Sequence, residues 1–312
     1  RGDEMAVRDD RGDVKQTTTG FRGPLMVQSL TSAKSKFLSL DLEQFLKVGH
    51  YATRILSEAK RLCPISKSPT DLVDRIYRTI NDTLRLEYRW VSIGTGVNQQ
   101  FVHNAWHSPD PFTDGDIIKV EIGLDITGYY VEVAETWSIG AVGESDRVLI
   151  ETTRKALESA IEVATCGTPI RAVGRAIYNC INDQGLSVAR YGAGHAIKVD
   201  ETSLDNRVFP WVLNWDSEIY RVKPSTLTVS SSELERSQDT LLSTGMCIAI
   251  EPMANAGGPF VMEDQVTLNI QEYKKAIHLP FWKTKDGSNT AKFVHTIFIE
   301  KDQTFLLTNG QA

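Results

Sequence analysis

Cysteine, long apolar runs and excess positive charge are all scarce in this 312-residue chain, and each scarcity excludes a class of protein. Four cysteines occur, none in C-x-x-C spacing, which predicts core thiols in a reducing compartment. No apolar run approaches the roughly 20 residues that a membrane-spanning helix needs, so no membrane partner is predicted. The net charge is −6, from 34 basic and 40 acidic residues, which argues against a nucleic-acid partner.

The chain length and the polarity of its N-terminus predict a cytoplasmic protein with one folded domain. The N-terminal segment through Gly20 is polar and charged, without the pattern of a signal peptide. Residues 1–36 lack apolar periodicity, so we predict a flexible arm, which could pack on a partner subunit in a homodimer. With 41% hydrophobic residues, residues 37–312 can bury a large core as a single domain. Within them, residues 201–240 are polar and irregular and predict an insertion on the surface or over a site.

Four segments have apolar residues at helical spacing and recognisable ends. The first is predicted from Leu42 to Leu62, and the second opens with Ser68 as N-cap before Pro69. Two more are predicted over 146–165 and 169–184, closed by Gly167 and Gly185. Because strand-like segments follow each helix pair, we predict an α+β fold of two halves related by internal pseudo-symmetry, with helices on one face of a shared sheet.

Two distant stretches read almost as copies, and each ends in a glutamate. In 115–121 and in 245–251 a glycine begins an apolar run that Glu121 or Glu251 closes six residues later. Such runs suit buried strands. Carboxylates at the ends of two buried strands are costly unless a cation compensates them, and a metal ion would serve that purpose.

A hairpin and a glycine-rich segment supply further potential ligands. Asp125–Gly128 has hairpin chemistry, and a turn centred near 126–127 would place Glu121 directly opposite Glu132. Such a pair repels unless a divalent cation lies between its members or both carboxylates face water. His195 follows Gly192 and Gly194; a lone histidine is more often a hydrogen-bonded core residue than a ligand. Taken together, Glu121, Glu132, His195 and Glu251 form a coherent ligand set for Zn, Mn, Fe or Co.

The order and spacing of several motifs resemble those of a type I methionine aminopeptidase, in the pita-bread metallopeptidase family that also includes prolidase and creatinase. The resemblance implies a pita-bread fold, in which pseudo-two-fold α/β halves share a curved antiparallel sheet covered by helices. It runs from about Leu42 to Thr308 and excludes 201–240. The matching motifs are Val97-Asn98, His103-Asn104, Asp114–Ile118, Gly128–Glu132, Gly194-His195, Ile250–Gly257, Lys283–Asp286 and Ala291–Thr296.

The chain departs from this family at the metal ligands. Where the family has two aspartates on the hairpin, this chain has Glu121 and Glu132, and the family's bridging glutamate falls on Val294. A second histidine of the family falls on Thr202. Glu263 lies in a stretch that resembles the glutamate-bearing strand of prolidases, so it is either a substitute ligand or a surface carboxylate.

These departures shape the predicted function. The loss of a bridging glutamate predicts one divalent ion (Fe, Mn, Zn or Co) held by Glu132, His195 and Glu251, with Glu121 as fourth ligand or base. His103 would donate a hydrogen bond or act as general acid. We predict a repurposed metalloenzyme, hydrolytic or redox-active, that acts on a small molecule or peptide. The alternatives are a non-catalytic binding protein on the same scaffold and an ordinary metal-dependent aminopeptidase.

Overall fold

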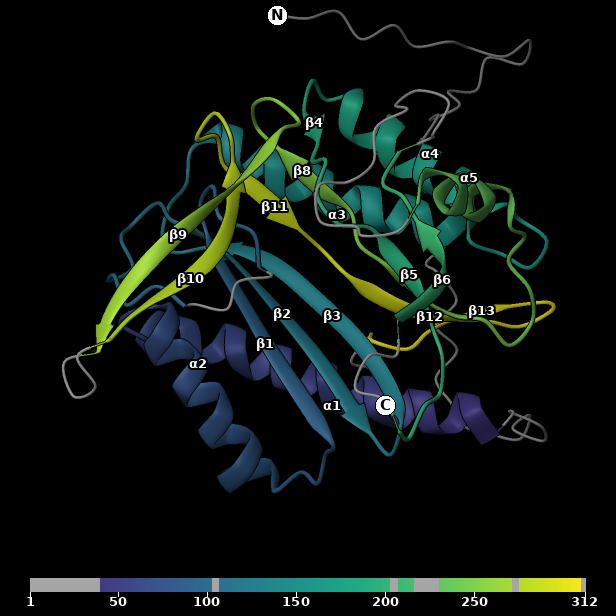
Figure 1. Ribbon diagram of the computed structural model, residues 1–312, viewed down its shortest axis with the longest axis horizontal. Coiled ribbons are helices and arrows are strands. Elements are labelled where there is room, and N and C mark those ends of the chain that lie inside the picture. The colour runs from purple at the N-terminus through teal and green to yellow at the C-terminus, as the bar shows by residue number, and fades with distance from the viewer. Residues whose placement is uncertain (1–39, 103–106, 203–206, 216–229, 271–274, 310–312) are drawn as a thin grey trace, which may run out of the picture. The chain divides into compact units, whose positions relative to one another are not determined.

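The computed structural model describes residues 40–102, 107–202, 207–215, 230–270 and 275–309 (Figure 1). Helices and strands alternate in the order that the sequence predicts: two helices and then strands, twice over. The helical elements are α1 (Leu40–Leu62), η1 (Cys63–Ile65), α2 (Pro69–Arg78), η2 (Thr79–Leu84), α3 (Glu144–Val163), α4 (Ile170–Asn182) and α5 (Ser231–Asp239). The strands are β1 (Trp90–Val97), β2 (Ile117–Ile126), β3 (Tyr129–Ser138), β4 (Ser187–Val188), β5 (Gly194–Ile197), β6 (Arg207–Val212), β7 (Cys247–Ile250), β8 (Met253–Asn255), β9 (Val261–Ile270), β10 (Lys275–Thr284), β11 (Thr290–Lys292), β12 (His295–Ile299) and β13 (Thr304–Leu306).

The four predicted helices are confirmed as α1, α2, α3 and α4. The residues predicted to begin or end three of them adopt the expected capping contacts or backbone angles. The Ser68 side chain accepts a hydrogen bond from the Asp71 backbone N–H at 3.2 Å, so it caps α2. After α3 and α4 the chain turns at Gly167 (φ 89°) and Gly185 (φ 71°). Only glycine adopts these positive φ values without strain.

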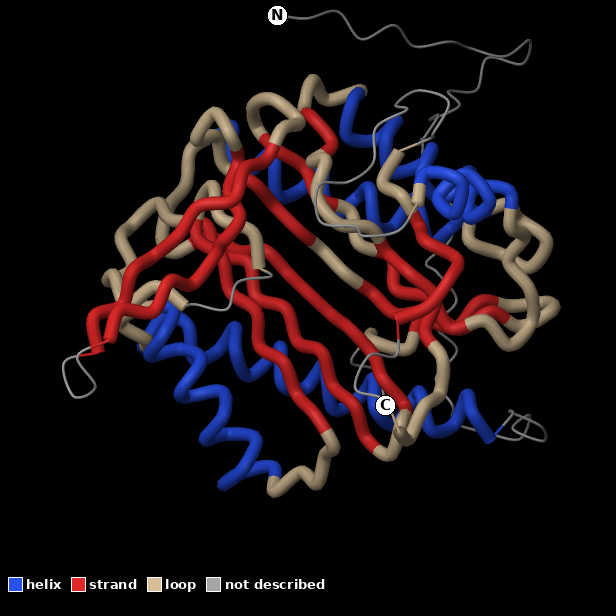
Figure 2. The backbone as a smooth tube through the Cα atoms, in the orientation of Figure 1, coloured by secondary structure: helices blue, strands red, loops and turns tan. Residues whose placement is uncertain are grey.

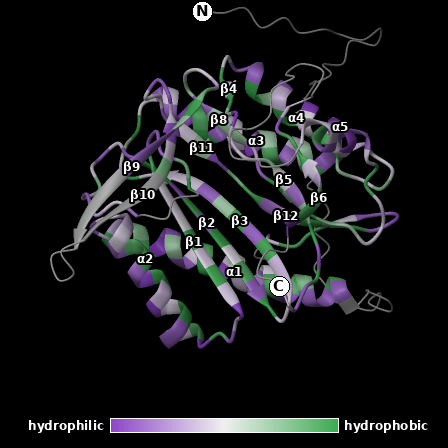
Figure 3. Cartoon of the chain, viewed as in Figure 1, coloured by the Kyte–Doolittle hydropathy of each residue, from purple (hydrophilic) through white to green (hydrophobic). Residues whose placement is uncertain are grey.

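Two antiparallel sheets carry the strands that matter for the site. The first has the order β1-β2-β3, and the second has the order β13-β12-β7-β5-β6 (Figure 2). Helix α1 packs on β2 and β3, while α3 packs on α4, β7, β8 and β11. Apolar residues such as Phe45, Ile122 and Leu124 fill the first core, and Figure 3 shows the hydrophobic stretches along β2 and α1. Leu157, Ile177 and Ile250 belong to the second core. Mixed helices and antiparallel sheets confirm the α+β class.

Backbone geometry supports the predicted pseudo-symmetry. Gly115 (φ 95°) and Gly245 (φ 89°) both open a strand from a left-handed turn. The N–H of Gly115 donates to the Ile139 carbonyl, and that of Gly245 to the Ile299 carbonyl, each at 2.8 Å. Strand β2 therefore corresponds to β7, with Gly115 matched to Gly245, and β3 corresponds to β12, with Ile139 matched to Ile299.

The two halves meet where equivalent residues face each other. Ala134 of β3 and Val294, just before β12, are matched by the same alignment of the two strands and form an isolated antiparallel bridge. The Ala134 N–H donates to the Val294 carbonyl at 3.1 Å, and the Val294 N–H returns a bond of 3.0 Å. The pseudo-two-fold axis therefore passes through this bridge.

The predicted hairpin register is wrong by two residues. The turn lies at Thr127 (φ 53°) and Gly128 (φ 90°), since a two-residue type I′ turn needs positive φ at both positions. Glu121 is paired with Ala134, and Glu132 with Gly123, so the two carboxylates are diagonal neighbours on one face. The predicted strand end at Glu121 is wrong too, because buried Ile122 and Leu124 extend β2 beyond it.

Most of the described part of 201–240 is ordered secondary structure, so its prediction as an irregular excursion is wrong. It contains β6 and α5, and Trp215 is only 1% exposed. Ser230 caps α5 by accepting a hydrogen bond from the Glu233 backbone N–H. This segment contributes to the second core instead of lying on it. Residues 203–206 and 216–229 lie outside the described residues, as does the predicted arm over 1–36.

The described residues group into one compact unit by their backbone contacts. Strands β9 and β10 pair only with each other among the named strands, as a long antiparallel hairpin. In the described part of the chain, no helix has both the length and the apolar character to cross a bilayer.

Candidate metal centre

Three side chains predicted as ligands come from three strands and meet in the interior. Glu132 lies in the middle of β3, His195 is the second residue of β5, and Glu251 directly follows β7. They are 8%, 3% and 2% exposed, respectively. Gly194 brings β5 close to β7, because a Cβ at this position would lie 2.3 Å from the Ala249 carbonyl oxygen. The glycine before the histidine therefore positions the ligand beside the strand that ends in Glu251.

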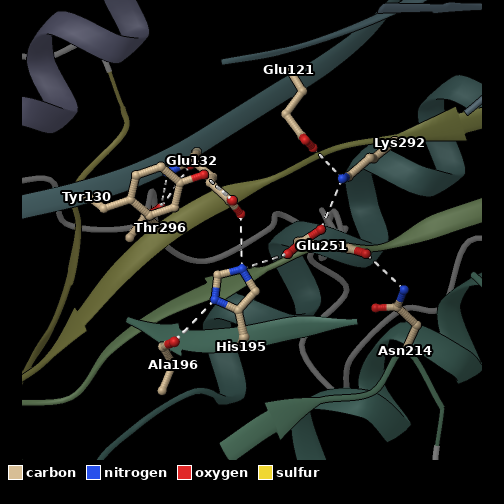
Figure 4. A network of polar contacts seen from close by, with 9 residues as sticks. All are labelled: Glu121, Tyr130, Glu132, His195, Ala196, Asn214, Glu251, Lys292 and Thr296. Atoms are coloured by element: carbon tan, nitrogen blue, oxygen red, sulfur yellow. Dashed lines mark hydrogen bonds and ion pairs between the residues drawn. The ribbon is translucent and has the colours of Figure 1, made fainter. Parts of the chain in front are cut away.

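The imidazole of His195 lies between the two carboxylates (Figure 4). Its Nε2 is 3.3 Å from Glu132 Oε2 and 3.5 Å from Glu251 Oε1. One potential ligand atom from each residue lies within 4.8 Å of the other two. His195 Nδ1 is 3.2 Å from the Ala196 carbonyl, an acceptor, so Nδ1 carries a proton. Nε2 then faces two acidic oxygens, an arrangement that requires either a second proton or a cation.

Neighbouring groups hold the Glu132 carboxylate and the backbone of both glutamates. The Tyr130 hydroxyl donates to Glu132 Oε1. The Thr296 hydroxyl binds the Glu132 backbone twice, accepting from its N–H at 2.9 Å and donating to its carbonyl at 2.8 Å. The Asn214 side chain donates to the Glu251 carbonyl at 2.8 Å. Such outer contacts orient ligands in metal sites, and the sequence-based reasoning did not identify them as part of the site.

Glu121 does not join the three-residue cluster, because it faces a buried lysine. Lys292 of β11 is 1% exposed, and its ammonium forms an ion pair with Glu121 and another, at 3.0 Å, with Glu251 Oε2. Three carboxylates against one ammonium leave two negative charges. With His195 neutral, a single divalent cation would balance them, so the donor set fits one such ion.

The pKa shifts reflect this crowding of charge. Burial alone would lower the pKa of His195, but the charge and hydrogen bond of Glu132, together with the charge of Glu251, outweigh it and raise the pKa. Burial favours the neutral form of Glu132, yet the charge and hydrogen bond of His195 lower its pKa. Burial and the Glu132 charge raise the pKa of Glu251. For Lys292, the charges of Glu121 and Glu251 outweigh burial and raise the pKa. Without metal, a proton on His195 therefore occupies the role of a cation, and metal binding would displace it.

Glu263 and the two positions where the family's ligands are missing, Thr202 and Val294, lie outside the cluster. Glu263 is exposed on β9, opposite Trp282 of β10, so the structure does not bring it to the cluster. Thr202 is exposed and donates to Asp200 at 2.7 Å. Val294 is fully buried in the bridge to Ala134. His103 lies outside the described residues.

Lys292 is the site residue that sequence reasoning overlooked, although a signal for it was present. It is a single charge in the run Ala291-Lys292-Phe293-Val294, which reads as a buried strand. A charge in such a run needs a buried partner. Aligning this run with β3 by the pseudo-symmetry would have placed Lys292 at the position of Glu132.

Comparisons with known proteins identify the family of the chain. A family model described as "Metallopeptidase family M24" matches residues 43–301. Methionine aminopeptidase 1 of Bacillus subtilis is 29% identical over 219 residues, which cover 70% of this chain and 73% of that protein. Methionine aminopeptidase 2 of Mycobacterium tuberculosis is 28% identical over 283 residues, covering 86% and 83%.

Solved structures show the same fold. A methionine aminopeptidase from Thermotoga maritima superposes with a TM-score of 0.66 at 24% identity, covering 87% of this chain and 98% of that one. A prolidase from Pyrococcus furiosus gives a TM-score of 0.58 at 14% identity, covering 86% and 64%. At these identities the superpositions support the pita-bread fold alone. The family match over most of the sequence shows more, and the chain belongs to metallopeptidase family M24.

Proposed function

We propose that the protein is a metal-dependent hydrolase of amide bonds in small peptides or related small molecules, with one divalent ion held by Glu132, His195 and Glu251. The convergence of these three buried side chains within 4.8 Å supports the proposal. One imidazole and two carboxylates suit Zn, Mn, Fe or Co. A bound ion would polarise the scissile carbonyl and lower the pKa of a water molecule.

The chain's own residues prepare the site for that chemistry. The Ala196 carbonyl holds His195 in the tautomer that presents Nε2 to the cluster. Tyr130 and Thr296 fix Glu132, which keeps one of its oxygens directed toward His195. Burial excludes water from the carboxylates, so their electrostatic interactions are stronger than at a surface. We propose His103 as the hydrogen-bond donor to the substrate, on the motif resemblance alone.

A function that departs from that of an ordinary methionine aminopeptidase is supported by two residues. Val294 offers no ligand atom, and Lys292 pairs with Glu121, which the sequence had predicted as a ligand. The relatives are named methionine aminopeptidases, so a peptide N-terminus is the first substrate class to test. A reducing cytoplasm is our proposal for the compartment, supported by the absence of any disulfide among the four cysteines, all of which are described.

A non-catalytic binding protein is the second candidate, and one observation favours it. Lys292 already neutralises part of the acidic cluster from within the chain, as a protein that had lost its metal would need. Against this, Glu132, His195 and Glu251 keep one potential ligand atom each within 4.8 Å of the others.

Elemental analysis of the purified protein after loading with Mn²⁺, Co²⁺ or Zn²⁺ separates the candidates. We expect one ion per chain in the wild type and less than about a tenth of that in Glu132→Ala and His195→Ala, because each variant loses one of three ligands. His50→Ala, on α1 and outside the cluster, serves as the matched histidine control and should keep its ion.

Each alternative has its own result. No metal under any loading condition would leave only the binding protein. Hydrolysis of Met-Ala peptides by the loaded protein at the rates of an ordinary aminopeptidase would favour the third candidate, an ordinary metal-dependent aminopeptidase, and would leave the metal site intact.

A further inference from the structure

The pseudo-two-fold axis relates Lys292 to Glu132. The alignment that matches β3 to β12 through Ala134 and Val294 also matches Glu132 to Lys292, because each lies two positions before its bridge residue. The hydrogen bonds around the two residues agree. Thr296 binds the N–H and carbonyl of Glu132 at 2.9 and 2.8 Å, and Thr136 binds those of Lys292 at 2.9 and 2.7 Å. Glu132 and Lys292 therefore occupy equivalent backbone positions with opposite charges.

The same symmetry relates Glu121 to Glu251, and the contacts around these residues define two positions for a positive charge. One lies among Glu132, His195 and Glu251, which are the proposed metal ligands. The other lies between Glu121 and Glu251, where the Lys292 ammonium sits (Figure 4). Glu251 serves both, since Oε1 faces His195 and Oε2 faces Lys292. A carboxylate shared in this way commonly bridges two cations, and here the second cation is a side chain.

We infer that the ammonium of Lys292 takes the place of a second metal ion and limits the centre to one. This inference rests on the proposed metal site and deepens it. The ammonium lies 3.0 Å from Glu251 Oε2 and is almost completely buried, so a divalent ion could not share the position with it.

Removing the ammonium changes the charge balance in a way that another cation can repair. In Lys292→Gln, Glu121 and Glu251 would remain buried without their counter-ion, which is strongly unfavourable. A second divalent ion would restore the balance by binding between the two carboxylates. In the double variant Lys292→Gln/Glu121→Gln one of those carboxylates becomes an amide, and the second position loses a ligand.

Titration with Mn²⁺, followed by calorimetry and electron paramagnetic resonance, tests this inference without an activity assay. We expect one ion in the wild type, two with an exchange-coupled signal in Lys292→Gln, and one in the double variant. Lys119→Gln is the matched control. Lys119 is also fully buried, but its ammonium donates to the backbone carbonyls of Asn98 and Thr290, so the stoichiometry should stay at one.

The outcomes distinguish this inference from the proposed function. One ion in both the wild type and a folded Lys292→Gln would overturn the inference and leave the proposed function standing. Two ions in the wild type would also overturn it. No ion in any protein would remove the proposed function and the inference together. Should Lys292→Gln fail to fold alone, Mn²⁺-dependent recovery of its folded state would support the inference, and failure at every Mn²⁺ concentration would refute it.

Discussion

Two threonine hydroxyls make equivalent hydrogen bonds in the two halves, so removing each one should lower the free energy of unfolding by a similar amount. Thr296 and Thr136 are 0% and 4% exposed, and each hydroxyl makes one accepted and one donated bond to the backbone of its partner residue. Valine has nearly the same shape and lacks the hydroxyl. Thr296→Val would therefore leave the N–H and the carbonyl of Glu132 unpaired in the interior, and Thr136→Val would do the same to Lys292.

The expected cost follows from these hydrogen bonds. A lost buried partner costs about 1–3 kcal/mol per unsatisfied group, with some relaxation toward other partners. We expect each substitution to lower the free energy of unfolding by about 2–4 kcal/mol, and the two values to agree within about 1 kcal/mol because the contacts are equivalent. Urea unfolding with an unchanged m-value measures both. A loss below about 0.5 kcal/mol in either variant, the lower limit for a single net hydrogen bond, would refute the reasoning.

The same two variants should differ in their affinity for metal. Thr296 holds the backbone of a proposed ligand, whereas Thr136 holds that of Lys292. Loss of an outer contact to a ligand typically weakens metal binding about 10-fold or more, so Mn²⁺ affinity should fall by roughly that factor in Thr296→Val and by less than about threefold in Thr136→Val. Equal losses would show that the outer contacts do not act through Glu132.

Two further predictions concern stability away from the metal. Burial lowers the pKa of His295 to about 4 from an ordinary value of 6.5, so the unfolded chain binds a proton that the folded chain refuses between these values. Stability should therefore fall as pH drops from 6.5 toward 4, by about 2 kcal/mol at pH 5. Urea titrations should show a smaller loss of stability over this pH range in His295→Gln than in the wild type. An equal loss would show that His295 does not cause the pH dependence. In Gly49→Ala the new Cβ would lie 2.1 Å from the Leu307 carbonyl oxygen, and we expect a loss of about 2–3 kcal/mol in thermal unfolding. Gly143→Ala, with nothing within 4 Å, is the control, and similar losses in both would rule out the clash.

Local chemistry predicted much of the fold. Ser68 and Pro69 identified the start of α2, and Gly167 and Gly185 identified the ends of α3 and α4, because these residues have few alternatives at helix ends. The repeated glycine-to-glutamate runs identified the pseudo-symmetry and two of the buried carboxylates. The glycine-rich segment before His195 drew attention to that residue, and motif resemblance supplied the fold family.

Features that depend on long-range packing were missed. The turn at 127–128 could have been placed from Gly128. Moving the turn by one residue shifts the strand pairing by two, so Glu121 lies opposite Ala134 and not opposite Glu132. The helix α5 had a capping signal in Ser230 and Glu233, hidden by the polarity of its surroundings. Lys292 carried a local signal of burial, but its pairing with Glu121 and Glu251 depends on two halves of the chain meeting at Ala134 and Val294.

A counter-charge that is part of the polypeptide cannot be chelated, dialysed or diluted away. Glu121 and Glu251 therefore obtain their compensation from Lys292 as the chain folds, whatever the metal supply of the surroundings. At the proposed metal site, folding and metal loading would be separate events. Metal starvation would then store an intact, reversibly inactive pool in place of a pool of unfolded chains awaiting degradation.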